Sequence, residues 1–302
     1  MKGCKFMLQA LQELQTTKIR TALITITITL IALMITFLSA LTQGLSHESV
    51  SALKAVAKDD ALVLNEGTST LSASHLDDQQ VEQLENLDAI PLMFAHDRVD
   101  TETVAVMNWD RDDNPPSEEL YFDHQPVIWS DTTTSGRELP VAGMLIPESK
   151  VATVKNIDGM QILEGADRWK ASGAYAGEQL SLTLMIVMLY IICTIITGAF
   201  FVVWTMQRLQ AVSVLSALGA SRKLLILQAL LQAVVVTAIG VILGSGITVG
   251  LISFIGDALP AVISVGTIIV PSLLISIAAL IGALFSLIPI LRIDPKTALE
   301  SL

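Results

Sequence analysis

The side chains that could do chemistry in this chain form none of the common catalytic motifs. The sequence contains no GxxxxGK(S/T) loop for ATP, no GxSxG nucleophile motif and no HExxH zinc motif. No two of its four histidines are spaced as a local metal pair, so each is more typical of a surface or packing position. These histidines are His47, His75, His96 and His124. The sequence therefore predicts a protein that is not an enzyme and has no nucleotide site or cofactor of its own.

Four long apolar runs are the elements that must position any functional side chain. The chain has 302 residues, of which 52% are hydrophobic and 16% are charged, with a mean hydropathy of +0.62. This composition is too apolar for an ordinary soluble domain. Each run reaches the roughly 20 residues that a helix needs to cross a bilayer. The runs predict transmembrane helices at 19–43, 179–206, 224–255 and 271–292, with a short outer connection over 256–270 that ends before Pro271.

The first run also has a strand-like pattern, because its stretch LITITITLI alternates apolar residues with threonine. A lone strand cannot lie in lipid with unpaired backbone groups, so we expect a helix. In that helix the small and polar residues form one stripe, which is typical of a helix-packing face, while Met34 and Phe37 point away from it. The stripe consists of Thr21, Thr25, Thr29, Ala32, Thr36, Ser39 and Gln43. A signal peptide is not expected, because the apolar run exceeds the usual core of about 7–15 residues.

Charge is divided unevenly between one block and the rest of the chain. Residues 44–178 hold 25 of the 29 acidic residues but only 9 of the 18 basic ones. The other nine basic residues lie near the ends of the predicted spans, and all fall on one side if both termini are cytoplasmic. The sequence therefore predicts a multi-pass protein of the cell membrane, with the acidic block outside and both termini inside.

The acidic block 44–178 is predicted to be a compact α+β extracytoplasmic domain inserted between transmembrane helices 1 and 2. The stretches DDALVLNEG, TVAVMNWD, ELPVAGMLIPES and KNIDGMQILEG have the composition of short strands closed by turns. The stretch SASHLDDQQVEQLENL is typical of a helix, with Ser74 as its predicted N-cap. The only cysteines are Cys4 and Cys193, so no disulfide is expected in this block.

Three landmarks of the sequence resemble one family of membrane proteins. The stretch VLSALGASRKLLILQALL, between the second and third spans, resembles the LRALGAS signature of the FtsX-like permeases, the MacB or type VII ABC transporter superfamily. The segment 1–18 looks like that family's amphipathic helix at the cytoplasmic interface. The tail that includes 293–302, in PILRIDPKTALESL, is similar to its closing segment. The order of one span, an outer domain and three further spans also matches.

The resemblance implies that 207–223 forms a coupling helix that docks into a separate cytoplasmic ABC ATPase. Val212, Leu215 and Leu218 would form an apolar strip that fits a groove, and Gly219 can end the helix. The resemblance also implies two ATPase copies, which bind ATP and magnesium, and a second copy of the permease itself. No nucleic acid is expected among the partners.

Two GxxxG pairs in the third span allow close approach of another helix, either within one chain or between two chains. They are Gly240 with Gly244 and Gly246 with Gly250. The sequence leaves both possibilities open for each pair.

Within the superfamily, the compact outer domain favours the haem-exporter permeases, the HrtB-like branch. Two alternatives remain open. One is an FtsX-type signalling permease that controls a cell-wall hydrolase, and the other is a permease that handles lipoproteins or peptides.

If haem is the transported substrate, the residues of interest lie near the outer halves of the first two spans. Haem is a flat apolar macrocycle whose iron is held by histidine, methionine, tyrosine or cysteine in most proteins. The expected set consists of Met34, Phe37, His47, Glu48 and Met188, of which Met34, His47 and Glu48 are candidate iron ligands. The mouth of the second span adds Tyr175 and Glu178. Each methionine could equally serve as core packing.

Overall fold

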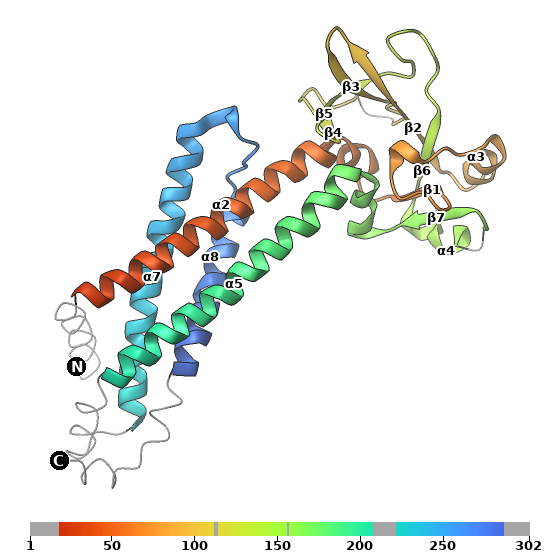
Figure 1. Ribbon diagram of the computed structural model, residues 1–302. Coiled ribbons are helices and arrows are strands. Elements are labelled where there is room, and N and C mark those ends of the chain that lie inside the picture. The colour runs from red at the N-terminus through yellow and green to blue at the C-terminus, as the bar shows by residue number, and fades with distance from the viewer. Residues whose placement is uncertain (1–17, 112–113, 156, 208–221, 287–302) are drawn as a thin grey trace, which may run out of the picture. The chain divides into compact units, whose positions relative to one another are not determined.

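The chain forms two compact units, which we describe separately. The computed structural model describes residues 18–111, 114–155, 157–207 and 222–286. The membrane unit comprises Met1–Leu41 and Leu182–Leu302, and the inserted domain comprises Thr42–Ser181. Four helices in the described part are long and apolar enough to cross a membrane. They are α2 (Lys18–Ala57), α5 (Gly173–Gln207), α7 (Arg222–Ile255) and α8 (Val265–Ser286) (Figure 1).

The first run is helical, as expected, in spite of its alternating pattern. The hydroxyl of Thr25 donates to the carbonyl of Thr21 at 2.8 Å, and the hydroxyl of Thr29 donates to the carbonyl of Thr25 at 2.8 Å. These bonds satisfy each hydroxyl on its own helix, so threonine is tolerated in an apolar span. The helix is longer than predicted and ends at Ala57, where Nε of Arg111 donates to the Val56 carbonyl at 2.6 Å.

Small residues let the helices of the membrane unit approach closely. A Cβ added at Gly240 would lie 2.7 Å from Ile28 of α2, and one at Gly244 would lie 2.6 Å from the Thr29 carbonyl. On the other pair of helices, a Cβ at Gly282 of α8 would lie 2.4 Å from the Thr194 carbonyl of α5. The predicted small-residue stripe of α2 is therefore a packing face, and the first GxxxG pair is used within the chain.

Helix α8 begins at Val265, six residues before the predicted start at Pro271, which lies inside the helix. Ser264 and Thr267 explain the earlier start. The amide of Thr267 donates to the Ser264 hydroxyl at 3.2 Å, and the amide of Ser264 donates to the Thr267 hydroxyl at 2.8 Å. This reciprocal capping satisfies amides at the helix start, much as a capping box does. Pro271 lies in the second turn of α8 and therefore does not mark the start of this helix.

The inserted domain is built on a seven-stranded sheet with the order β4-β5-β3-β2-β6-β1-β7. All neighbouring strands are antiparallel except β3 and β5, which are parallel. The strands are β1 (Ala61–Asn65), β2 (Ile90–Val99), β3 (Glu102–Met107), β4 (Tyr121–Phe122), β5 (Gln125–Trp129), β6 (Val141–Ile146) and β7 (Met160–Leu163). Two short α-helices, α3 (Asp78–Glu85) and α4 (Val151–Val154), complete the α+β fold. The four predicted strands are β1, β3, β6 and β7.

The predicted helix of this domain is shorter than expected and begins later. Its N-cap is Asp77, whose carboxylate accepts from the Gln80 amide at 2.8 Å, while the Gln80 side chain accepts from the Asp77 amide. Ser74 is therefore not the N-cap. Its hydroxyl instead accepts from the Asn65 amide at 3.0 Å and ties the segment before α3 to β1.

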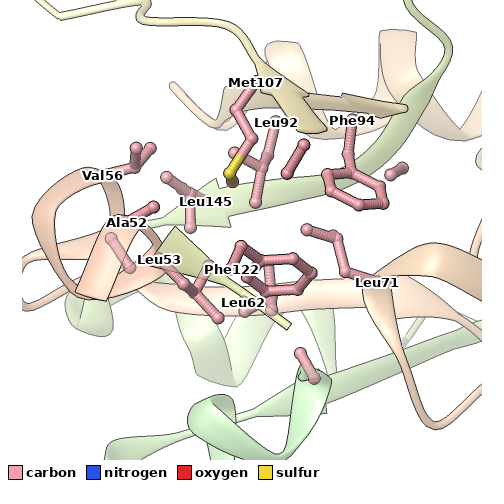
Figure 2. Packing of buried hydrophobic residues seen from close by; sticks show 14 of the residues in the cluster. Ala52, Leu53, Val56, Leu62, Leu71, Leu92, Phe94, Met107, Phe122 and Leu145 are labelled. Carbon is pink, nitrogen blue, oxygen red and sulfur yellow. The ribbon is translucent and has the colours of Figure 1, made fainter. Parts of the chain in front are cut away.

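The core of the inserted domain includes the last turns of α2. Ala52, Leu53 and Val56 pack with buried side chains of β1, β2, β3, β4 and β6 and of the 3-10 helix Leu71–Ala73. Figure 2 shows these three residues among their labelled partners. Those partners include Leu62, Leu71, Leu92, Phe94, Met107, Phe122 and Leu145. Phe94 and Phe122 meet edge to face with ring centroids 5.1 Å apart. Because α2 supplies part of this core, its last turns are fixed to the sheet by apolar packing.

Candidate functional site

The candidate residues of the membrane unit lie on open apolar surfaces of α2 and α5. Met34 is 51% exposed and Met188 is 60% exposed, whereas Thr36 on the packing side of α2 is fully buried. Phe37 is partly buried and lies one turn after Met34. On a helix, residues three apart are neighbours, so this thioether and this ring can contact the same apolar ligand.

Met188 belongs to a broad exposed face of α5. Its exposed neighbours are Leu184, Met185, Val187, Ile191 and Ile192. Such a face is compatible with lipid, a second chain or an apolar ligand. Among the described residues, no hydrogen bond or ring contact joins Met188 to Met34 or Phe37, so their common role stays a prediction.

The two candidate residues of the inserted domain, His47 and Glu48, each face the hairpin formed by β4 and β5. The ring of His47 lies with its centroid 6.4 Å from that of Tyr121. Oε2 of Glu48 lies 3.4 Å from Nδ1 of His124. Burial, together with the negative charges of Glu119 and Glu48, raises the pKa of the Tyr121 phenol.

His124 lies beside the predicted pair, and the sequence interpretation missed its contacts. Its Nε2 lies 2.9 Å from Oε1 of Glu178, while its Nδ1 faces Glu48, so the imidazole stands between two carboxylates. It is 33% exposed, and each carboxylate side chain is 37% exposed. His124 is therefore a partly exposed residue whose ring also links two acidic side chains. Its partners lie 76 and 54 positions away in sequence, beyond the reach of any local motif.

Glu178 carries one unusual atom. Its second carboxylate oxygen, Oε2, is buried and has no hydrogen-bond partner within the described part of the chain. A buried polar atom without a partner is destabilising. The contact between Oε1 of Glu178 and His124 is therefore the one that holds this carboxylate in place.

The described residues contain no metal-binding cluster, and the predicted coupling residues lie outside them. Among the described residues, no group of three or more histidine, cysteine, aspartate or glutamate side chains could hold a metal ion. The predicted ATPase-coupling residues lie in the segment 208–221, outside the described residues. They are Val212, Leu215, Leu218 and Gly219.

Comparison with known proteins shows a similarity to membrane permeases. Residues 183–295 match the family model described as FtsX-like permease C-terminal. Two proteins from strains of Staphylococcus epidermidis, each named "Putative hemin transport system permease protein HrtB", are 25% identical to this chain over an alignment of 343 positions. Each alignment covers 96% of this chain and 98% of the relative.

A protein of the same name from Staphylococcus haemolyticus is 33% identical over 147 residues, which cover 49% of this chain and 42% of that relative. The similarity thus extends along nearly the whole chain at modest identity, and the match to the family model falls on α5, α7 and α8. Residues 183–295 therefore resemble the C-terminal domain of FtsX-like permeases, and the chain as a whole is similar to proteins named as hemin transport permeases.

Proposed function

We propose that this chain is the permease subunit of an ABC efflux system that exports haem from the membrane. The observation that carries the proposal is the similarity along 96% of the chain to proteins named as hemin transport permeases. The FtsX-like domain over residues 183–295 supports the role of an ABC-type permease.

The system needs a separate ATPase, because the sequence has no Walker loop. We expect two ATPase subunits and two copies of the permease, with the segment 207–223 docking into each ATPase. ATP and magnesium would then be bound and used by the partner, and the permease would pass on the movement.

Haem would enter from the lipid through the open faces of α2 and α5. It is apolar enough to partition into a bilayer, and the exposed thioethers of Met34 and Met188 are soft ligands or contact groups for it. Phe37 offers a ring to the macrocycle. His47 and Glu48, in the inserted domain, would receive the iron or the polar edge of haem as it leaves the membrane.

Transport would proceed by a change in shape, without an aqueous pore. The stretches 21–43, 182–206, 224–255 and 271–291 contain no charged residue, so they offer no hydrophilic ion path. The last turns of α2 are part of the core of the inserted domain. A movement of α2 would therefore be transmitted to the sheet through packed side chains.

The coupling step can be tested with Leu215→Asp, which places a charge on the predicted apolar strip. The variant should lose copurification with the ATPase while it still inserts in the membrane, and cells that produce it should accumulate more haem than wild type. Ser213→Asp is the matched control, because it places the same charge on the opposite side of the predicted helix. Retention of the ATPase by Leu215→Asp would count against the coupling role.

A further inference from the structure

The hairpin between β4 and β5 turns at two residues, Asp123 and His124, whose backbones are both left-handed. Their φ angles are 49° and 62°, and they are the two loop residues between the paired Phe122 and Gln125. Two successive left-handed residues define a type I′ turn, which favours Asn-Gly because other side chains are strained there. Such strain persists where the surrounding contacts hold the residues in place.

One side of this turn is attached to α2. The amide of Asp123 donates to the Ser49 carbonyl at 3.1 Å, and the amide of His124 donates to the Glu48 carbonyl at 3.1 Å. The next attachment is through Ser51, whose hydroxyl accepts from the Tyr121 amide at 2.8 Å. Turn and helix are thus joined through backbone groups, which no change of side chain in the turn can remove.

The other side of the turn is attached to the start of α5. Oδ1 of Asp123 accepts from the Ser172 hydroxyl at 2.6 Å and from the Ala174 amide at 3.1 Å. Ser172 is itself the N-cap of α5, because its hydroxyl accepts from the Tyr175 amide at 3.1 Å. Asp123 therefore adds a second cap from a distant hairpin, and its negative charge lies at the positive end of the helix dipole.

His124 joins the two helices directly, since its ring lies between Glu48 of α2 and Glu178 of α5. Both contacts are partly exposed, so water can replace them when the helices separate. The Asp123 bond to Ser172 is less exposed. The side chain of Phe122, next to the turn, is fully buried in the domain core, so the turn cannot shift freely.

We propose that the Asp123–His124 turn is a clamp that sets the separation of α2 and α5 within the inserted domain. The outer segments of these helices, from Thr42 on α2 and up to Ser181 on α5, belong to this domain, and both helices continue into the membrane unit. Asp123 and His124 are positioning residues, which act through the two helices. This inference deepens the proposed function by naming the place where helix movement and sheet movement are linked.

The test measures the distance between spin labels at Gln43 and Gly177, two exposed positions of the inserted domain, in the full-length permease without haem or ATP. Cys4 is replaced by serine, and Cys193 is buried. Wild type should give a narrow distance distribution, and His124→Gly and Asp123→Ala should broaden it. Because glycine adopts the left-handed conformation without strain, His124→Gly removes the ring and leaves the turn favourable. Asp123→Asn, which tolerates this conformation and keeps an acceptor, should restore the narrow distribution.

The control is His75→Gln, at an exposed histidine whose side chain makes no hydrogen bond, ion pair or ring contact among the described residues. A distribution that stays narrow in both His124→Gly and Asp123→Ala overturns the clamp. A second readout is ATP hydrolysis by the permease–ATPase complex: His124→Gly should keep the basal rate and lose stimulation by haem. If haem fails to stimulate even the wild-type complex, the proposed substrate is wrong, and the label distances still decide the clamp.

Discussion

Thr36 of α2 and Thr248 of α7 share a 2.7 Å hydrogen bond between their hydroxyl groups, and both side chains are fully buried. The Thr36 hydroxyl also contacts the Ala32 carbonyl at 2.7 Å, and the Thr248 hydroxyl contacts the Gly244 carbonyl at 3.1 Å. This contact lies beside the close approach of α2 and α7 at Gly244. It is a polar link between two apolar helices, where few other partners are available.

Thr36→Val should destabilise the membrane unit by about 0.6 kcal/mol, and by no more than about 1.7 kcal/mol, as measured for hydrogen bonds between membrane helices. The substitution keeps the shape of the side chain and removes the hydroxyl. Unfolding in mild detergent by increasing amounts of a denaturing one would measure the change. Thr27→Val is the matched control, because Thr27 is bonded only within α2, to the Leu23 carbonyl. Equal effects in the two variants would contradict a role for the interhelical bond.

The two GxxxG pairs of α7 should respond differently to alanine. Gly244→Ala should lower stability by about 1–3 kcal/mol, because its new methyl group would overlap the backbone of α2. Gly246→Ala should leave the stability of the single chain unchanged, since a Cβ there meets nothing within 4 Å.

The same pair of variants also decides what the second glycine pair does. If a second copy packs on Gly246 and Gly250, Gly246→Ala should weaken the dimer in detergent, as measured by crosslinking or light scattering. If Gly246→Ala leaves the affinity of the dimer unchanged, this face of α7 contacts lipid and not a second copy.

The inserted domain should lose stability in acid through Asp97. The Thr134 hydroxyl donates to its carboxylate at 2.5 Å and the Thr134 amide does so at 2.6 Å, and these bonds hold the pKa of Asp97 below its usual value. A depressed pKa means that the contribution is present above about pH 4, where the unfolded carboxyl is ionised, and is lost as pH falls through the folded value.

Thr134→Val should therefore reduce the difference in Tm between neutral and acid pH, measured on the full chain. Thr132→Val, at an exposed threonine whose hydroxyl makes no hydrogen bond with the described residues, should leave that difference as it is. An identical pH dependence in Thr134→Val and wild type would show that this hydroxyl does not hold Asp97 in its ionised form.

Thiol labelling should give the orientation of the chain. In a Cys4→Ser background, a reagent that cannot cross the membrane should label Asn114→Cys from outside the cell and Gly219→Cys only after the membrane is opened. The nine basic residues at the span ends motivate this expectation. Labelling of both positions from the same side would remove the proposed topology.

The sequence predicted the elements better than it predicted their contacts. The first run has a strand-like pattern, but we predicted a helix because lipid offers no hydrogen-bond partners to the backbone of a lone strand. The structure confirms the helix. The start of α8 was misplaced, because Pro271 is a more visible signal than the capping pair Ser264 and Thr267. The same happened at α3, where Asp77 and Gln80 form the cap in place of Ser74.

His124 shows why a site assembled by the fold escapes local analysis. Its importance comes from Glu48 and Glu178, which lie far from it in sequence and reach it only through the β4–β5 turn. The dipeptide Asp123–His124 lacks the glycine of the favoured Asn-Gly and Asp-Gly turns, so the sequence carried no clear signal for a two-residue hairpin here. Neither the turn nor the two helices that hold it could be placed from local sequence.

The most direct test of the proposed function is a titration of the purified permease with haem, followed by its Soret band. Wild type should bind haem and shift the band, and alanine substitution should weaken binding at one or more of the five predicted positions. These are Met34, Phe37, His47, Glu48 and Met188. Met206→Ala is the matched control. Met206 also lies on α5 and is about as exposed as Met188, but it is outside the predicted set. Unchanged affinity in all five variants would contradict the site, and a wild-type protein that binds no haem would contradict haem export itself.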